Sequence, residues 1–390
     1  MTGHSRWHRP VSAVSCAVLL GALLPETPHL QAVAAAAAAA ILVTAPARRF
    51  PLDAAALAVA VVWLVSWRLS PRAEAPVQML VLLLVLAGFS RFPTRWLVPA
   101  LTAILSLALL VLGFATLVDL FRGGMRTTHY PGLGAWGGYP EIGLLGTAVL
   151  PVTVTLARHA PTRRTAIAGS LVTLVAAASV LLSYSRGAWA ASLAGAGFAL
   201  VATHRHRAVV TTTAALVLGV AVLGLVPSMG ELAGSVLTRS GNVAVETRLE
   251  GWQRAATLWR ERPVLGWGPG AYRAAFQQRF PGHESDARVH AHSHYLQTAA
   301  ETGTAGVVVL AVLGLTVLRN VTRPRPDDSA VSRVARIGVA CGMCAVALRF
   351  TLDFFDPAGA ALPVLILLAM LAGIGVADEV APAAGDSPRA

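Results

Sequence analysis

The sequence places three histidines at alternate positions, in the segment His290-Ala-His292-Ser-His294. An imidazole titrates near neutral pH, so this segment can supply a general base or ligands for a metal ion. Along a helix, residues i and i+2 point about 200° apart, so the three side chains cannot all reach one ion. Glu284 and Asp286 lie nearby, but not at a convincing ligand spacing. A single histidine that acts as a base is therefore favoured over a metal site.

Two arginines could hold an anion. Arg186 follows Ser183-Tyr184-Ser185 in a tight turn between two apolar segments, and Arg248 lies beside the apolar stripe of an expected helix. A guanidinium can grip a phosphate or carboxylate through two parallel hydrogen bonds. Each arginine also has an ordinary alternative. Arg186 could reach lipid headgroups at the membrane interface, and Arg248 could pair with Glu246 or Glu250 on a solvated helix face.

The composition excludes a soluble protein. Hydrophobic residues make up 55% of the 390 residues, charged residues only 13%, and the mean hydropathy is +0.64. A soluble domain carries roughly 25% charged residues. All 31 basic residues are arginine, and they stand between apolar segments without forming a basic face, so the net charge of +12 does not indicate nucleic-acid binding.

The cysteine pair Cys341 and Cys344 lies in an apolar segment, where small packing residues are the favoured interpretation.

Hydropathy predicts an all-α polytopic membrane protein with about twelve transmembrane helices. Apolar stretches near the roughly 20 residues that cross a bilayer core recur along the chain. The candidate spans are 11–24, 29–45, 52–67, 77–90, 96–119, 139–157, 165–183, 187–202, 208–226, 304–318, 334–349 and 359–377. The long connection 227–303 is expected to contain a helix from Val245 that stops at Pro263, a glycine-rich turn at 266–270, and a helix from about Ala291 into the next span.

The arginines also predict the orientation. With the N-terminus in the cytoplasm, seventeen of the 31 arginines fall on short cytoplasmic segments and six on short outer connections, Arg349 among these six. Cytoplasmic loops carry the excess of basic residues in membrane proteins. The long loop with Arg248 and the histidines, and the turn with Arg186, are therefore expected on the outer face.

At these residues the chain resembles the O-antigen ligase and Wzy-type polymerase superfamily. Ser185-Arg186-Gly187 is similar to its serine-arginine-glycine segment, and Thr247-Arg248 through Trp252, with the turn 262–270, is similar to its arginine helix and proline-glycine turn. His292-Ser293, nine residues, Gly303, two residues and Gly306 match its histidine motif. The matches occur in the family's order, and His292 takes the motif position, whereas the motif leaves the positions of His290 and His294 variable.

The resemblance implies a membrane glycan transferase with a fold similar to the GT-C class. Such an enzyme moves a glycan from undecaprenyl diphosphate to an acceptor hydroxyl on the outer face of the inner or plasma membrane, inverts the anomeric carbon, and uses no metal and no other cofactor. His292 would be the base, and Arg186 and Arg248 would hold the diphosphate. Tyr184, Trp252 and Tyr295 would shape the sugar site, although packing is an equally good interpretation of each.

Two other functions compete with a ligase. A Wzy-type polymerase or protein-glycosylating transferase of the same superfamily would carry the same motifs, because the motifs do not specify the acceptor. A transporter of lipid-linked glycan should show internal repeats with interrupted helices and charges within the spans. No clear repeat is present, and charges within the spans are rare. A non-enzymatic scaffold leaves the histidine motif unexplained. The expected domains are N-terminal spans at 1–138, a ligase-like core at 139–320, C-terminal spans at 321–377 and a cytoplasmic tail at 378–390.

The orientation can be tested by single-cysteine labelling in a cysteine-free background. Cysteines at Gly241 and His283 should react with a reagent that cannot cross the membrane, and a cysteine at Asp327 should be protected, because the arginine asymmetry places position 327 inside. The reverse pattern would contradict both the orientation and an outer active site.

Overall fold

The structure, a computed structural model, has helices as the regular secondary structure of its described residues. These are residues 51–91, 97–121, 139–183, 185–203, 243–281, 290–325, 328–355 and 362–376. The helices are α3 (Pro51–Leu69), α4 (Val77–Phe89), α5 (Leu97–Phe121), α6 (Tyr139–Arg158), α7 (Arg163–Leu182), α8 (Arg186–Ala202), α11 (Val243–Glu261), α12 (Tyr272–Arg279), α13 (His294–Thr322), α14 (Ala330–Leu352) and α15 (Leu362–Val376).

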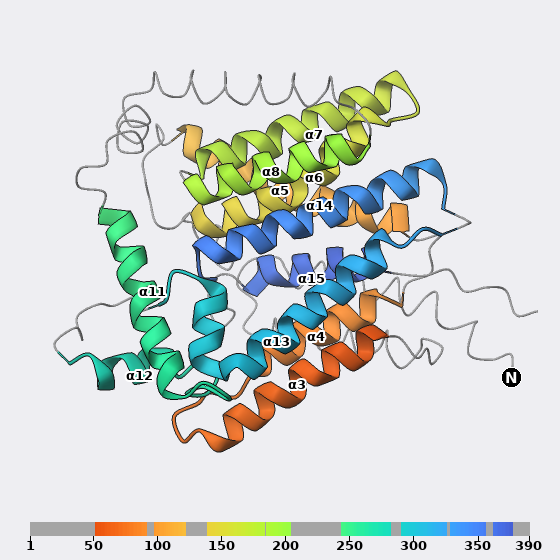
Figure 1. The fold of residues 1–390 in the computed structure, drawn as a ribbon. Helices are drawn as coiled ribbons and strands as arrows, with labels where there is room; N and C mark the ends of the chain where they lie inside the picture. The colour runs from red at the N-terminus through yellow and green to blue at the C-terminus, as the bar shows by residue number, and fades with distance from the viewer. Residues whose placement is uncertain are drawn as a thin grey trace, which may run out of the picture.

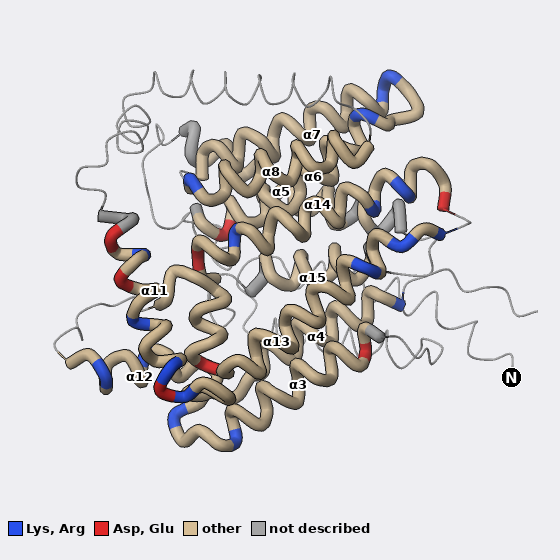
Figure 2. Tube along the Cα trace, in the orientation of Figure 1, with Lys and Arg blue, Asp and Glu red and all other residues tan. Residues whose placement is uncertain are grey.

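The helices agree with a multi-pass membrane protein. Nine of the twelve expected spans fall on described helices, and the other three, 11–24, 29–45 and 208–226, lie outside the described residues. Of the described helices, α3, α6, α7, α13 and α14 are long and apolar enough to cross a membrane, and α4, α5 and α15 contain shorter apolar stretches. In Figure 2 the charged residues gather at the helix ends and on α11 and α12, while the middles of the long helices are free of charge. The total of twelve spans remains a prediction.

The long helices form a bundle around α6. Helix α6 packs against α7, α8 and α14, while α13 packs against α3, α14 and α11 (Figure 1). The span in α6 is 78% buried by protein, against 17% in α7, so α6 is central and α7 peripheral. Small residues allow this packing: a side chain at Gly342 of α14 would collide with the carbonyl oxygen of Ala148 in α6. The neighbouring Cys341 is free and buried, as expected for a packing residue, whereas Cys344 is free and exposed, so the packing interpretation is wrong for Cys344.

Helices α11 and α12 stand together at one end of the bundle (Figure 1). The helix predicted from Val245 to Pro263 is confirmed as α11, whose buried stripe includes Ala255 and Leu258. These two residues pack in a small core with Tyr272 and Phe276 of α12 and with Ala300 of α13. The amphipathic helix is thereby fixed against the start of α13, so its polar side chains have defined positions.

The expected glycine-rich turn fits into a break in α13. Gly303 adopts φ 68° and ψ −169°, which interrupts the helix. The amide N–H groups of Thr304 and Ala305 donate to the carbonyl oxygens of Pro263 and Val264, at 2.8 and 3.2 Å. In return, the N–H of Trp267 donates to the carbonyl oxygen of Ala300 at 3.0 Å. The turn thus satisfies backbone groups that the break frees, and it sets the direction of α13 beyond the histidine segment.

The break at Gly303 should be sensitive to a single methyl group. In Gly303→Ala the new Cβ would overlap the carbonyl oxygen of Val264, and the backbone conformation is nearly exclusive to glycine. We expect a loss of about 2 kcal/mol or more of stability, measured as a lower thermal unfolding temperature in detergent. The matched control is Gly314→Ala in the same helix, where nothing lies within 4 Å of the new Cβ. Equal unfolding temperatures for the two variants would contradict this account of the break.

Candidate active site

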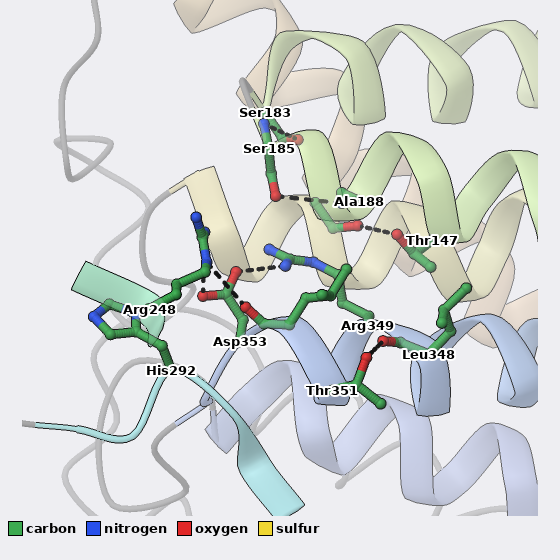
Figure 3. A network of polar contacts seen from close by, with 12 residues as sticks. Thr147, Ser183, Ser185, Ala188, Arg248, His292, Leu348, Arg349, Thr351 and Asp353 are labelled. Carbon is green, nitrogen blue, oxygen red and sulfur yellow. Dashed lines mark hydrogen bonds and ion pairs between the residues drawn. The ribbon is translucent and has the colours of Figure 1, made fainter. Parts of the chain in front are cut away.

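Arg248 reaches from α11 to the end of α14. Its Nε donates to the carbonyl oxygen of Leu352 at 3.2 Å, and its Nη2 lies 3.9 Å from Oδ1 of Asp353 (Figure 3). The side chain is 31% exposed, so solvent or a ligand can still reach it. The expected pairing along the helix face occurs one turn on, where Arg254 pairs with Glu250. Arg248 therefore contacts the end of a helix other than its own.

His292 is held by its backbone in an unusual conformation. It is the only described residue other than glycine with a positive φ, 50°. Its carbonyl oxygen accepts from Nε1 of Trp252 at 3.2 Å, and its N–H donates to Nδ1 of His290, also at 3.2 Å. Helix α11 lies close to the backbone that precedes His292: a Cβ on Gly251 would be only 3.2 Å from the carbonyl oxygen of Ala291. These contacts fix the place of the imidazole without using its ring.

Two opposing charges and burial set the basicity of His292. Burial lowers the pKa of the half-buried imidazole below its ordinary value, Asp353 acts to raise this pKa, and Arg248 acts to lower it. The net shift is downward, which keeps the ring neutral at neutral pH. Nδ1 of His292 is buried and has no hydrogen-bond partner among the described residues. The arrangement gives an unprotonated imidazole beside a cation, which suits a proton acceptor next to a bound anion.

Asp353 and Arg349 complete this cluster, and the sequence analysis did not identify either as a site residue. Arg349 belongs to the last turn of α14, is 1% exposed, and donates from Nη1 to the carboxylate of Asp353 (Figure 3). The N–H of His294 donates to the carbonyl oxygen of Asp353 at 3.0 Å, which ties the histidine segment to α14. The signal in the sequence was an arginine followed four residues later by an aspartate at the end of an apolar span.

The start of α8 meets the same cluster. Ser185 caps this helix, since its Oγ accepts from the N–H of Ala188 at 3.3 Å. The next residues are Arg186 and Gly187, and a Cβ on Gly187 would lie 2.7 Å from Nη1 of Arg349. The glycine of the serine-arginine-glycine segment therefore lets α8 approach the buried guanidinium. The structure brings the backbone at Arg186 to this end of α14, while Arg248 and His292 arrive from the other side.

One expectation about a neighbouring residue changes. The expectation that His290 turns away from His292 is wrong: their rings are 4.0 Å apart, because residues 290–293 precede the helix. Nε1 of Trp252 donates to the carbonyl oxygen of His292, and the hydroxyl of Tyr295 donates to the carbonyl oxygen of Ala347 at 3.0 Å. The role of these two side chains in a sugar site stays a prediction.

The other candidate residues lie outside the described residues or, for His294, have their ring against aromatic side chains. Tyr184, Glu284 and Asp286 lie outside the described residues. His294 stacks between Phe350 and Phe354, with ring centroids at 4.7 and 5.6 Å. Within the described ranges, no three His, Cys, Asp or Glu side chains form a group that could hold a metal ion.

Comparison with known proteins matches this region to one family. Residues 171–311 match the family model described as O-antigen ligase (Wzy_C). The match begins within α7, covers α8, α11 and α12, and ends in α13, so it includes Arg186, Arg248 and His292 and stops before Arg349 and Asp353. No curated protein matches the chain.

The electrostatics of His292 can be measured directly. In ¹⁵N-histidine NMR of the protein in detergent, the imidazole of His292 should titrate below an ordinary histidine, because burial disfavours its charged form. Asp353→Asn removes the charge that raises this pKa, so it should lower the midpoint further. His292→Gln assigns the signal. A midpoint at or above the ordinary value, or an upward shift in Asp353→Asn, would contradict the described environment.

Proposed function

We propose, from the premise that this chain is a member of the O-antigen ligase superfamily, that it transfers a glycan from undecaprenyl diphosphate to an acceptor hydroxyl on the outer face of the membrane. The observation that carries the proposal is the convergence of Arg248 and His292 from two segments far apart in sequence, with the start of α8 at Arg186 beside them. A cation beside a neutral imidazole suits a reaction in which the cation binds an anion and the imidazole accepts a proton.

In this reaction the acceptor oxygen attacks the anomeric carbon of the glycan while His292 takes the hydroxyl proton. The bond between the anomeric carbon and the diphosphate oxygen breaks, and undecaprenyl diphosphate leaves with the bonding electrons. Attack from the side opposite the leaving group inverts the anomeric carbon. Arg186 and Arg248 stabilise the negative charge that develops on the diphosphate, through charge-assisted hydrogen bonds that suit its geometry.

The proposal is tested by giving the purified protein in nanodiscs an undecaprenyl-diphosphate glycan and a panel of acceptors. The panel contains lipid A core, free glycan, wall polymer and protein, and mass spectrometry detects the products. A single transfer to a non-glycan acceptor supports a ligase, whereas growth of the glycan supports a Wzy-type polymerase. If the protein, placed in vesicles, moves intact lipid-linked glycan across the vesicle membrane and forms no covalent product, transport would replace the proposed function. A protein that neither transfers nor transports the glycan would contradict the proposed function.

Lysine should not replace Arg186 or Arg248 in the proposed transfer reaction. In Arg186→Lys and Arg248→Lys the charge remains, but the planar fork that matches a diphosphate is lost. Each variant should lose about 2 kcal/mol of transition-state stabilisation, or roughly thirtyfold in rate. The matched control is Arg260→Lys, an exposed arginine on the same helix as Arg248. Activity near that of the control in both variants would remove these arginines from the reaction.

The histidines should differ from one another in the same assay. His292→Ala should lose about 10² to 10⁴-fold in transfer rate while it still binds the lipid-linked donor, because only the base is removed. His290→Ala should keep a large part of the activity, since it removes one backbone hydrogen bond of His292 and leaves that of Trp252. Transfer should persist in excess chelator. Failure of His290→Ala, His292→Ala and His294→Ala alike, with zinc or magnesium restoring a chelated enzyme, would indicate a metal site.

A further inference from the structure

The backbone just before α13 is strained at His292, and several contacts impose its conformation. Residues 290–293 precede the helix, and His292 has a positive φ of 50°. A residue other than glycine keeps such a conformation only where its surroundings impose it. Trp252 and His290 supply two contacts, at the carbonyl oxygen and at the N–H of His292. A third contact is made at Ala291, which is fully buried.

Gln297 makes this third contact from inside α13. The N–H of Ala291 donates to Oε1 of Gln297 at 3.0 Å, and the bond is buried. Gln297 itself is only 6% exposed. Its side chain thus directs an acceptor out of its own helix, to the residue that precedes His292. Without this oxygen, the N–H of Ala291 would lose its acceptor at a place where water does not replace it, which is costly for a buried donor.

Glu301 sets the direction of the amide of Gln297. Nε2 of Gln297 donates to Oε1 of Glu301, one helical turn further on, at 3.1 Å. An ionised carboxylate only accepts hydrogen bonds, so it binds Nε2 and leaves Oε1 of the amide directed to Ala291. The other oxygen of this carboxylate, Oε2, accepts from the N–H of Gly270 at 3.2 Å. Two side chains therefore connect the glycine-rich turn to the histidine segment.

We propose that Gln297 is a positioning residue for glycan transfer: its amide, oriented by Glu301, binds the N–H of Ala291 and so keeps the imidazole of His292 where it accepts the proton. This inference rests on the proposed function. Gln297 does not touch the donor or the acceptor, because its side chain is buried. Without its oxygen, the N–H of Ala291 finds a new acceptor only if residues 290–293 change conformation. Relaxation of the positive φ would then turn the imidazole of His292.

The first test replaces the amide of Gln297 with an apolar side chain of similar size. In Gln297→Leu, kcat for transfer should fall on the order of tenfold to a hundredfold, because misplaced catalytic groups commonly cost this much. The KM for the lipid-linked donor should stay within about threefold of wild type, since the donor is bound by other residues. In ¹⁵N-histidine NMR, the midpoint of His292 should rise toward that of an ordinary histidine, because a turned ring loses the burial that lowers its pKa.

Ser66→Ala is the matched control for a general loss of stability. Ser66 is fully buried in α3, and its Oγ donates to the carbonyl oxygens of Leu265 and Glu301 at 2.7 and 3.2 Å. The change removes buried hydrogen bonds beside the same network and leaves the amide of Gln297 in place. It should lower the thermal unfolding temperature and leave the midpoint of His292 unchanged. A midpoint shift as large as that in Gln297→Leu would overturn the positioning role.

An exchange of the two side chains is a sharper test. Gln297→Glu alone places two carboxylates at the 3.1 Å contact, so it should slow transfer as Gln297→Leu does. In the double variant Gln297→Glu with Glu301→Gln, the carboxylate at position 297 can accept from Ala291 and from the amide at position 301. The oxygen of that amide can accept from Gly270. Because the three hydrogen bonds are kept with one donor and acceptor exchanged, kcat should return to within about threefold of wild type.

The outcomes separate the two proposals. A lower kcat with a shifted His292 midpoint, both restored by the exchange, supports the positioning role. An unchanged kcat or midpoint in Gln297→Leu, or a folded double variant as slow as Gln297→Glu, would overturn it. Thermal unfolding and size-exclusion profiles establish which variants fold, and the exchange carries the test if Gln297→Leu does not. The midpoint is measured without glycan, so a wild-type protein that transfers no glycan contradicts the proposed function, and NMR still decides whether Gln297 positions His292.

Discussion

The buried charge of Arg349 constrains the whole end of the bundle. Arg349 lies in the last turn of α14, and its side chain is 1% exposed. Its guanidinium therefore does not extend into bulk water, as the head groups of arginines at a membrane interface commonly do. Asp353, one turn further on, is the counter-ion that makes this position tolerable. The helix ends at Leu352, and the carbonyl oxygen of Asp353 accepts from the N–H of His294. The residue that pairs with Arg349 therefore also ties α14 to the histidine segment.

Glycines let the remaining segments close around this pair. Gly187 allows α8 to approach Arg349, and Gly251 allows α11 to approach the backbone that precedes His292. At each of these two positions a side chain would keep the helix at a greater distance. The cluster therefore depends on the absence of a side chain at Gly187 and Gly251. Gly303 has a related role further along α13, because its break lets the turn after Pro263 dock there. The polar side chains meet because Gly187 and Gly251 let α8 and α11 come closer to their neighbours than larger residues would allow.

The parts of this arrangement that follow local rules could be predicted from the sequence. Hydropathy predicted 139–157 for a helix that spans Tyr139–Arg158, and the apolar stripe from Val245 predicted α11. The pairing of Arg248 with the end of α14 could not be predicted, since it joins residues 104 positions apart. The contact of His290 with His292 depends on a positive φ in a short irregular segment, which a helical wheel cannot represent. The hydrogen bond from Tyr295 to the carbonyl oxygen of Ala347 also joins two helices, so no local pattern could predict it.

A base beside arginines presents an electrostatic conflict, which Asp353 partly offsets. Cations attract the diphosphate, but the same cations lower the pKa of a neighbouring imidazole and weaken it as a base. Arg248 has this effect on His292, and Asp353 opposes it. Once a diphosphate occupies the arginines, its own negative charge would act on His292 in the same direction as Asp353. In the proposed reaction the imidazole therefore becomes a stronger base when the donor is in place, so proton transfer is favoured when there is a glycan to receive the attack.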